Sequence, residues 1–242
     1  MPHSPGPQSA EARASAAESE LQSFSYMVSH DLATSLRHVS EFSRLLLGDV
    51  GDILTGPQQS HAEHIRHATG RCQMMMDQLL VFSRVQQKPM APVLQDATVI
   101  MRMAMMRLGV ADEAVLGVSL RPLGEVFADT ELLGVVFEHL LDNALKFRRP
   151  GDSPRIAIEA HADPASWRLR ITDNGIGVEG PLREKAFEMF RRLNGETAYP
   201  GVGAGLAISR RIARRHGGDL KFLDCPEGAS IELALPCGPA LQ

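Results

Sequence analysis

The stretch Ser29-His30-Asp31-Leu32-Ala33-Thr34 lies in a run whose apolar residues recur at spacings of three and four. This spacing predicts a long amphipathic helix with one buried stripe. The stripe consists of Leu21, Phe24, Val28, Leu32, Leu36, Val39, Phe42 and Leu46. At about 100° per residue, His30 is turned about 200° from both Val28 and Leu32, so it is expected to face solvent beside Asp31. Most such pairs are solvated surface pairs, but an accessible imidazole beside a proton acceptor can also act as a nucleophile.

The sequence around this stretch predicts an antiparallel helical hairpin. The first helix is expected to end near Gly48, and a second amphipathic helix to cover about residues 58–87. Two helices alone cannot enclose a core, and pairing with a second copy would complete a four-helix bundle. The patterning therefore predicts a homodimer.

The second half of the chain mixes helices and strands. Helices are expected from Asp96 to about Leu108, from about residue 131 to 147 after a cap at Asp129 or Thr130, and over residues 203–216. Short strands are expected at residues 118–120, 126–128, 155–160, 167–171, 220–223 and 230–235. The expected fold is α+β in two domains, the second an α/β sandwich with one sheet covered on one face by helices. Residues 178–203, with one short helical piece at 182–190, are expected to form a functional lid or a loop.

Composition excludes several classes of protein. The 242 residues carry a net charge of −4, which does not favour a nucleic-acid or membrane surface. The three cysteines are far apart and lack the spacing of metal ligands, so they are interpreted as reduced thiols of a cytoplasmic protein. No apolar run approaches the roughly 18 residues that span a bilayer.

Three patches in the second half carry residues suited to chemistry. The first is Glu138-His139-Leu140-Leu141-Asp142-Asn143-Ala144-Leu145-Lys146-Phe147, on a helix. The second is Asp173-Asn174-Gly175-Ile176-Gly177, at the end of a strand. The third is Gly201-Val202-Gly203-Ala204-Gly205-Leu206-Ala207-Ile208, at the start of a helix. Each is weak alone, because Asp-Asn-Gly and Gly-x-Gly-x-Gly also occur in ordinary turns.

Together the patches suit a bound phosphate ester. Glycines before a helix let backbone N–H groups approach phosphates at the positive end of the helix dipole. The oxygen of Asn143 is a hard ligand that suits Mg²⁺, and Lys146 can pair with phosphate oxygens. Asp173, buried at a strand end, can accept a hydrogen bond from an exocyclic amine such as that of adenine.

The order of these patches resembles a bacterial sensor histidine kinase, with a phosphoacceptor hairpin followed by an ATP-binding domain of the type shared with gyrase and MutL. The resembling segments are His30–Thr34 (H-box), Leu140–Phe147 (N-box), Asp173–Gly177 (first Gly-box), Phe187–Leu193 (F-box) and Gly201–Leu206 (second Gly-box). The sequence from Phe190-Arg191-Arg192-Leu193 to Tyr199-Pro200-Gly201 is most similar to the phytochrome-like branch. The resemblance covers about residues 15–237 and favours the chemical interpretation of His30.

The resemblance implies a role for each matching residue. His30 would be the phosphoacceptor with Asp31 as its acid/base partner, and Arg192 would stabilise the transferring phosphoryl group. Thr34 stands where family members that dephosphorylate their response regulator carry a polar residue. ATP would be bound with Mg²⁺ held by Asn143, and residues 178–203 would be the ATP lid. The nucleotide-binding set would be Asn143, Lys146, Asp173, Gly175, Gly177, Phe190, Gly201, Gly203, Gly205 and Leu206.

Three residues depart from the family pattern. Ser35 stands in place of the usual helix-kinking Pro, which leaves the first helix straighter. His139 stands where many members have the first Asn of the N-box, so one expected Mg²⁺ oxygen is missing and His139 remains a base or a polar ligand. Val202 replaces the usual Thr of the second Gly-box and removes a hydroxyl but no backbone N–H.

The expected domains are a disordered N-terminus (1–14), a dimerisation and phosphotransfer hairpin (15–90), a catalytic ATP-binding domain (91–237) and a tail (238–242). The leading hypothesis is a dimeric, ATP-dependent protein-histidine kinase that phosphorylates a response regulator receiver domain. The alternatives are a phosphotransfer protein or pseudokinase with a scaffold ATP-like domain, and a non-kinase ATPase of the gyrase/MutL type, which does not explain the hairpin. The signal is expected to come from an upstream sensor domain or from a partner protein.

Overall fold

The computed structural model describes residues 31–110, 117–195 and 199–238, and it divides into two compact units between Gln87 and Lys88. Each unit is described by itself. His30 lies outside the described residues. In the described part of the chain, no helix is both long enough and apolar enough to cross a membrane.

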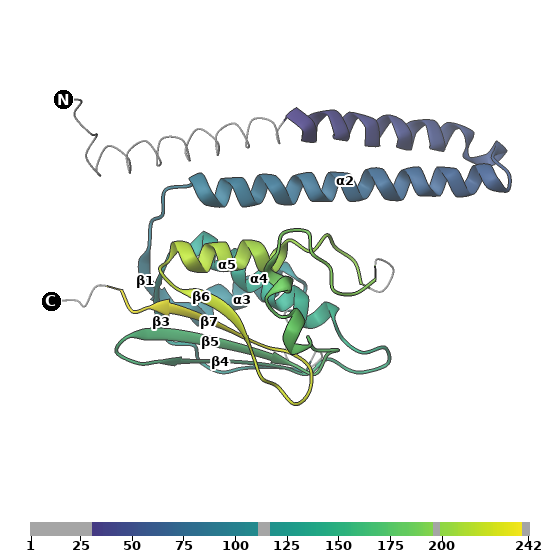
Figure 1. Cartoon of the computed structure of the whole chain (residues 1–242). Helices are drawn as coiled ribbons and strands as arrows, with labels where there is room; N and C mark the ends of the chain where they lie inside the picture. The colour runs from purple at the N-terminus through teal and green to yellow at the C-terminus, as the bar shows by residue number, and fades with distance from the viewer. Residues whose placement is uncertain (1–30, 111–116, 196–198, 239–242) are drawn as a thin grey trace, which may run out of the picture. The chain divides into compact units, whose positions relative to one another are not determined.

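The first unit is helical. A helix runs unbroken over residues 31–50, the short 3₁₀ helix η1 (Gly51–Ile53) follows, and α2 (Pro57–Gln87) runs back in the opposite direction (Figure 1). The first helix therefore ends near Gly48, as expected. No proline interrupts it at position 35, where the Ser35 hydroxyl donates a hydrogen bond to the Asp31 carbonyl over 3.1 Å.

The predicted stripe of the first helix is largely exposed in the single chain. Leu32, Val39, Phe42 and Leu46 keep between 51% and 69% of their surface, whereas Ala33 is buried. Apolar area of this kind on a helix face commonly marks a protein–protein interface.

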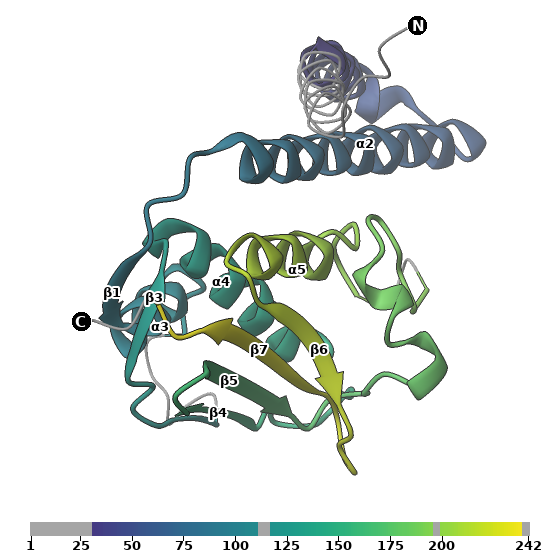
Figure 2. The ribbon, with the colours of Figure 1, turned by 60° about the vertical axis from the view of Figure 1, so that its left-hand side comes forward.

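The second unit is built on a five-stranded mixed sheet in the order β2-β4-β5-β7-β6. Its strands are β2 (Val118–Leu120), β4 (Ile156–Ala162), β5 (Ser166–Asp173), β6 (Asp219–Leu223) and β7 (Ser230–Pro236). Only β2 and β4 pair in parallel, and the other neighbours are antiparallel. A separate antiparallel pair is formed by β1 (Val93–Asp96) and β3 (Glu125–Ala128) (Figure 2).

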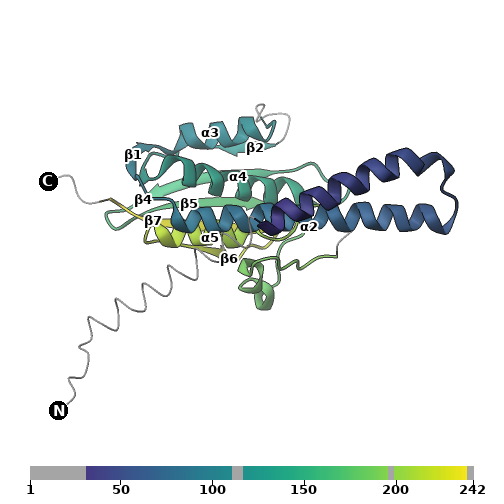
Figure 3. The same cartoon turned by 90° about the horizontal axis from the view of Figure 1, so that it is seen from above.

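Three helices cover one face of the large sheet: α3 (Ala97–Arg107), α4 (Thr130–Lys146) and α5 (Gly205–Arg215) (Figure 1). Seen from above, α4 lies between α3 and α5 (Figure 3). The core between helices and sheet contains Phe137 of α4, Ile208 of α5 and Trp167 of β5, all fully buried. The indole N–H of Trp167 is hydrogen-bonded inside the core, where it donates to the Leu123 carbonyl over 2.8 Å.

The predicted helix caps are confirmed. Asp96 accepts a hydrogen bond from the Thr98 amide, and Asp129 accepts one from the Leu132 amide at the start of α4. The strand predictions are also confirmed within a few residues, and β1 is an additional strand.

The predicted helical piece at residues 182–190 is wrong. This stretch contains two short 3₁₀ helices, η2 (Gly180–Leu182) and η3 (Lys185–Phe187). The chain then turns at Phe190, whose φ of 63° is the left-handed conformation that ends a helix. A nine-residue helix is marginal by itself, and the burial of Phe187 outweighs its propensity.

Candidate functional site

The second unit contains a cavity between the C-terminal half of α4, the end of β5 and the start of α5. Its empty volume is about 970 Å³ including its open mouth, which is within the range of small-molecule sites. Apolar residues form most of its floor, among them Ile171, Phe222 and Ile231. The predicted site residues that line it are Asn143, Asp173, Gly177, Arg192, Gly201, Gly203, Gly205 and Leu206.

Asp173, the last residue of β5, is the acidic group of the cavity. Its Oδ1 accepts hydrogen bonds from the backbone N–H groups of Gly175, at 2.8 Å, and Ala229, at 3.2 Å. Among the described residues, no donor reaches Oδ2, which leaves that oxygen to accept from a ligand. Burial raises the pKa of the Asp173 carboxyl, and the two amide hydrogen bonds oppose that rise.

Gly175 and Gly177 allow the backbone to pack tightly below Asp173. A Cβ at Gly175 would lie 2.4 Å from the Phe147 carbonyl oxygen, and one at Gly177 would lie 2.6 Å from the Gly228 carbonyl oxygen. Gly177 also has a φ of +72°, which other residues rarely adopt. Gly175 does not line the cavity, so its place is structural support for Asp173.

Asn143 and Lys146 lie in the last turns of α4. Asn143 lines the cavity, whereas Lys146 lines a neighbouring depression that shares Tyr199 and Pro200 with it. The Lys146 ammonium lies 3.7 Å from Asp142 Oδ2 and 4.6 Å from the centroid of the Phe147 ring. Burial lowers the pKa of Lys146, and the nearby Arg192 charge adds to this while Asp142 opposes it. A cation that is partly desolvated in this way gains when an anion binds beside it.

The second Gly-box leads into the N-terminus of α5. No side chain caps this end of the helix, where Ala204 is the cap residue and Gly205 the first helical residue. The first N–H groups of α5 are therefore available to an anion at the positive end of the helix. Gly203 precedes this turn with a φ of +75°, and a Cβ there would lie 2.5 Å from the Arg191 carbonyl oxygen.

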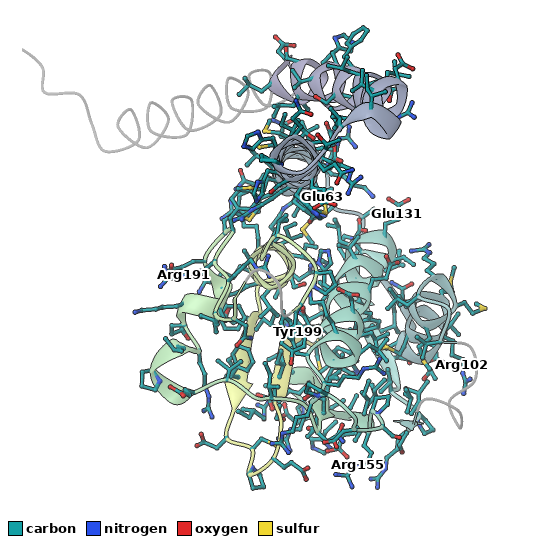
Figure 4. The ribbon with its side chains drawn as sticks, turned by 90° about the vertical axis from the view of Figure 1, so that its right-hand side faces the viewer. Glu63, Arg102, Glu131, Arg155, Arg191 and Tyr199 are labelled. Carbon is teal, nitrogen blue, oxygen red and sulfur yellow. The ribbon has the colours of Figure 1, made fainter. Side chains whose placement is uncertain are left out.

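The segment over the cavity is held by Arg192 and Tyr199. The Arg192 guanidinium donates to the carbonyl oxygens of Tyr199, at 2.7 Å, and Gly195, at 3.1 Å. The Tyr199 ring packs on Phe147 with centroids 5.0 Å apart, and its hydroxyl donates to the Arg148 carbonyl over 3.1 Å. Arg191, on the same segment, is exposed at the surface of the unit (Figure 4). Phe190 does not line the cavity.

The hairpin residues of the predicted site belong to the first unit. His30 lies outside the described residues, Asp31 is exposed and Thr34 is half-buried. The structure therefore groups the nucleotide-binding candidates, and the assignments of His30, Asp31 and Thr34 stay predictions.

Sequence reasoning missed two contributors to the site. Ala229 supplies an amide to Asp173 from the turn before β7, and Tyr199 supplies the aromatic contact described above. The sequence Cys225-Pro226-Glu227-Gly228 marks that turn. Its closeness to Asp173 follows from the pairing of β5 with β7, which local sequence does not reveal.

The donor set suits a metal that is carried by a phosphate ligand. Among the described residues, no three His, Cys, Asp or Glu side chains come together as a metal site. Mg²⁺ in nucleotide sites is usually held by one or two protein oxygens together with phosphates and water. The Asn143 side chain on the cavity wall is such an oxygen donor, so the residues fit Mg²⁺ bound with a nucleotide.

Comparison with known proteins agrees with this arrangement. Residues 128–239 match the family described as histidine kinase-, DNA gyrase B- and HSP90-like ATPases. The solved mycobacterial sensor histidine kinase MprB is 30% identical, with a TM-score of 0.51 over 60% of this chain and 97% of its own. The chain belongs to the sensor histidine kinase family.

Two further relatives of this chain are phytochromes from Nostoc sp.. Cyanobacterial phytochrome A is 29% identical over 222 residues, which are 90% of this chain and 29% of the relative. Cyanobacterial phytochrome B is 33% identical over 211 residues, which are 83% of this chain and 27% of the relative. The chain thus spans less than a third of the length of either phytochrome.

Proposed function

We propose that the chain is the kinase region of a sensor histidine kinase that autophosphorylates His30 with ATP and passes the phosphoryl group to an aspartate of a response regulator. The observation that supports this best is the cavity of the second unit. One wall carries the free oxygen of Asp173, another carries Asn143, and the uncapped N-terminus of α5 opens into the same space. Asp173 suits the exocyclic amine of one Mg-ATP molecule. Asn143 suits the metal bound to its phosphates, and the N-terminus of α5 suits its phosphate oxygens.

ATP would bind with its adenine at Asp173 and its phosphates towards α5. Asp173 Oδ2 would accept from the exocyclic amine while the apolar floor contacts the ring. The backbone N–H groups around Gly203 and Gly205, together with Lys146, would bind phosphate oxygens. Asn143 would hold Mg²⁺, which neutralises charge on the phosphates.

In the transfer step, the unprotonated imidazole nitrogen of His30 would attack the γ-phosphorus, and the proton on the other ring nitrogen would pass to the Asp31 carboxylate. The bond from the γ-phosphorus to the β,γ-bridging oxygen breaks, and its electron pair leaves with ADP. Such a transfer depends on positioning and on stabilisation of charge more than on covalent chemistry by the protein. Arg192 would leave the carbonyl oxygens of Gly195 and Tyr199 to contact the transferring group.

The hairpin would serve as the dimerisation and phosphotransfer domain, over about residues 15–90, ahead of a catalytic domain at 91–237. Its exposed apolar side chains, Phe42 and Leu46 among them, would form a four-helix bundle with a second copy. A receiver domain would dock on the hairpin near His30. Thr34, four residues after His30, would orient water for a second activity, hydrolysis of the phosphorylated regulator.

The test is incubation of the full chain with γ-labelled ATP and Mg²⁺, followed by chemical analysis of the labelled protein. Phosphohistidine is labile in acid and stable in base, so this is the expected behaviour of the label. His30→Gln is expected to abolish labelling and Asn143→Asp to lower it strongly. The matched control is His38→Gln, at an exposed histidine of the helix over residues 31–50, which should label normally.

Two outcomes would contradict the proposal. No label on the wild-type chain would favour a phosphotransfer protein or pseudokinase with a scaffold ATP-like domain. Label that survives His30→Gln would mean that another residue is the phosphoacceptor.

A further inference from the structure

His139 lies on α4 one turn before Asn143, but its side chain contacts α5. It is absent from the lining of the cavity that contains Asn143. Its Nδ1 lies 3.3 Å from the Oγ of Ser209, and its ring lies next to Gly205. Both partners belong to α5, on adjacent turns.

The imidazole also determines how closely α4 and α5 approach. A Cβ added at Gly205 would lie 3.3 Å from the His139 Cγ and 3.5 Å from its Cβ and Cδ2. These are the nearest atoms to that position, so the ring fills the space that a side chain at Gly205 would need. Gly205 is the first residue of α5 and lines the cavity. The ring of His139 therefore lies directly behind the backbone that is expected to bind phosphate.

The surroundings favour a neutral ring. Burial lowers the pKa of His139, while the nearby carboxylates of Asp142 and Glu138 raise it and the Lys146 charge lowers it. Ser209, its partner on α5, is fully buried and neutral. A neutral imidazole adds no positive charge behind the N-terminus of α5, where a cation would be unfavourable.

We propose that His139 is a positioning residue that fixes the start of α5 against α4 through Ser209 and Gly205, and that it is not a metal ligand. This rests on the proposed function of the cavity as an ATP site. The family amide at this position would offer an oxygen to Mg²⁺, whereas this chain uses the position to join its two nucleotide-binding helices. Loss of the contact would let the first turn of α5 move relative to Asn143, which weakens nucleotide binding whether or not metal is present.

The test is equilibrium binding of ATP and ADP to the full chain, once with Mg²⁺ and once with EDTA. The variants are His139→Ala, Ser209→Ala and the double variant. We expect His139→Ala to weaken ATP binding about tenfold, as for one partly buried hydrogen bond with its packing, and by the same factor in EDTA. Ser209→Ala should have part of this effect, and the double variant should be no weaker than His139→Ala, because both changes break one contact.

Further variants separate positioning from other roles. His139→Gln, which can still reach Ser209, should recover part of the affinity, and the KM for ATP should change more than kcat. His161→Ala, at an exposed histidine on β4, is the matched control and should bind normally. Ser209→Ala is the smaller change, and it tests the contact even if His139→Ala unfolds.

Three outcomes would overturn the inference. The first is an affinity loss confined to Mg²⁺ conditions or a shift in the Mg²⁺ concentration that half-saturates labelling, either of which would identify His139 as a metal ligand. The second is additive effects of the two single variants, and the third is normal binding by both. These outcomes are distinguishable from failure of the proposed ATP site, because in that case the wild-type chain itself would bind no ATP.

Discussion

At the residue scale, the two carboxylate oxygens of Asp173 have different roles, one in holding the side chain in place and one in ligand recognition. Oδ1 is held by the amides of Gly175 and Ala229, while no donor among the described residues reaches Oδ2 of this cavity-lining residue. The motif Asp173–Gly177 pointed to an adenine contact, but two facts could not be predicted from it. One is that the two oxygens differ in role, and the other is that Ala229 supplies an amide. Both depend on the turn before β7, which is distant from Asp173 in the sequence.

Asp173→Asn should change which purine binds. Asn keeps an oxygen for the two amides, so the fold should survive, but an N–H donor replaces Oδ2. We expect the affinity for ATP to fall about 30-fold, as for loss of a hydrogen bond to a charged group. ITP, which carries an oxygen in place of the amine, should bind the variant better than ATP does. Equal losses for both nucleotides in competition binding would mean that Asp173 does not contact the purine edge.

Gly203→Ala should strain the backbone of the segment over the cavity and so weaken ATP binding. The substitution puts a Cβ 2.5 Å from the Arg191 carbonyl oxygen at a φ of +75°. The left-handed conformation alone costs about 1–2 kcal/mol for a residue with a side chain, and the clash adds to it. Gly180→Ala is the matched control, since nothing lies within 4 Å of its Cβ position and its φ is ordinary. ATP affinity should fall for the first variant only, and an equal fall for both would contradict this account.

At the element scale, Arg210 of α5 joins three parts of the second unit. Its Nε and Nη2 donate to the two Asp219 oxygens of β6, at 2.9 and 3.1 Å, and its Nη1 donates to Glu184 at 2.7 Å. The guanidinium also lies 4.6 Å from the Phe187 ring centroid in η3. This cluster keeps the first part of residues 178–203 packed, although the whole stretch was predicted as one lid or loop.

Arg210→Lys should destabilise the unit, because Lys cannot bind Asp219 with two parallel hydrogen bonds or stack in the same way. We expect a loss of about 1 kcal/mol in the free energy of unfolding, measured by urea titration at pH 7. Arg121→Lys, at an exposed pair with Glu159, is the control and should change little. Equal losses of unfolding free energy for both variants would show that the Arg210 cluster stabilises the unit no more than an exposed ion pair does.

The same cluster makes a pH prediction. Its hydrogen bond and charge from Arg210 lower the pKa of Asp219 from 3.8 to about 2, against the effect of burial. Because the folded-state pKa is depressed, the stabilisation is complete above about pH 4 and is lost as pH falls towards about 2. The difference in unfolding free energy between wild type and Arg210→Lys should shrink across that window. A constant difference down to pH 2 would contradict the assignment.

The elements that were predicted well carry their own local signals. Asp96 and Asp129 cap helices as expected, because a cap is set by neighbouring residues. Residues 182–190 were predicted wrongly, because Phe187 is fixed by Phe222 and Arg210 from far along the chain. The order of the sheet and the pairing of β1 with β3 likewise depend on contacts between distant residues.

At the scale of the whole molecule, the two units differ in how complete they are within a single chain. All residues that line the nucleotide cavity fall between Leu140 and Ile231, so this site is complete within the second unit. The hairpin instead leaves large apolar side chains exposed, with Phe42 at 69% and Leu46 at 61%. A stripe of this kind was predicted from spacing alone, but which residues remain exposed follows from how the two helices pack.

Phe42→Glu should therefore separate assembly from nucleotide binding. A buried charge at the centre of a helical interface is strongly unfavourable, so we expect monomers by light scattering at micromolar concentration where the wild-type chain is dimeric. Arg37→Glu adds a negative charge to the same helix about 140° away from Phe42, and it should leave the dimer intact. ATP affinity should stay at the wild-type value in both variants, because none of the described hairpin residues lines the cavity. A wild-type chain that is already monomeric, or a Phe42→Glu variant that stays dimeric, would show that this stripe is not the contact between copies.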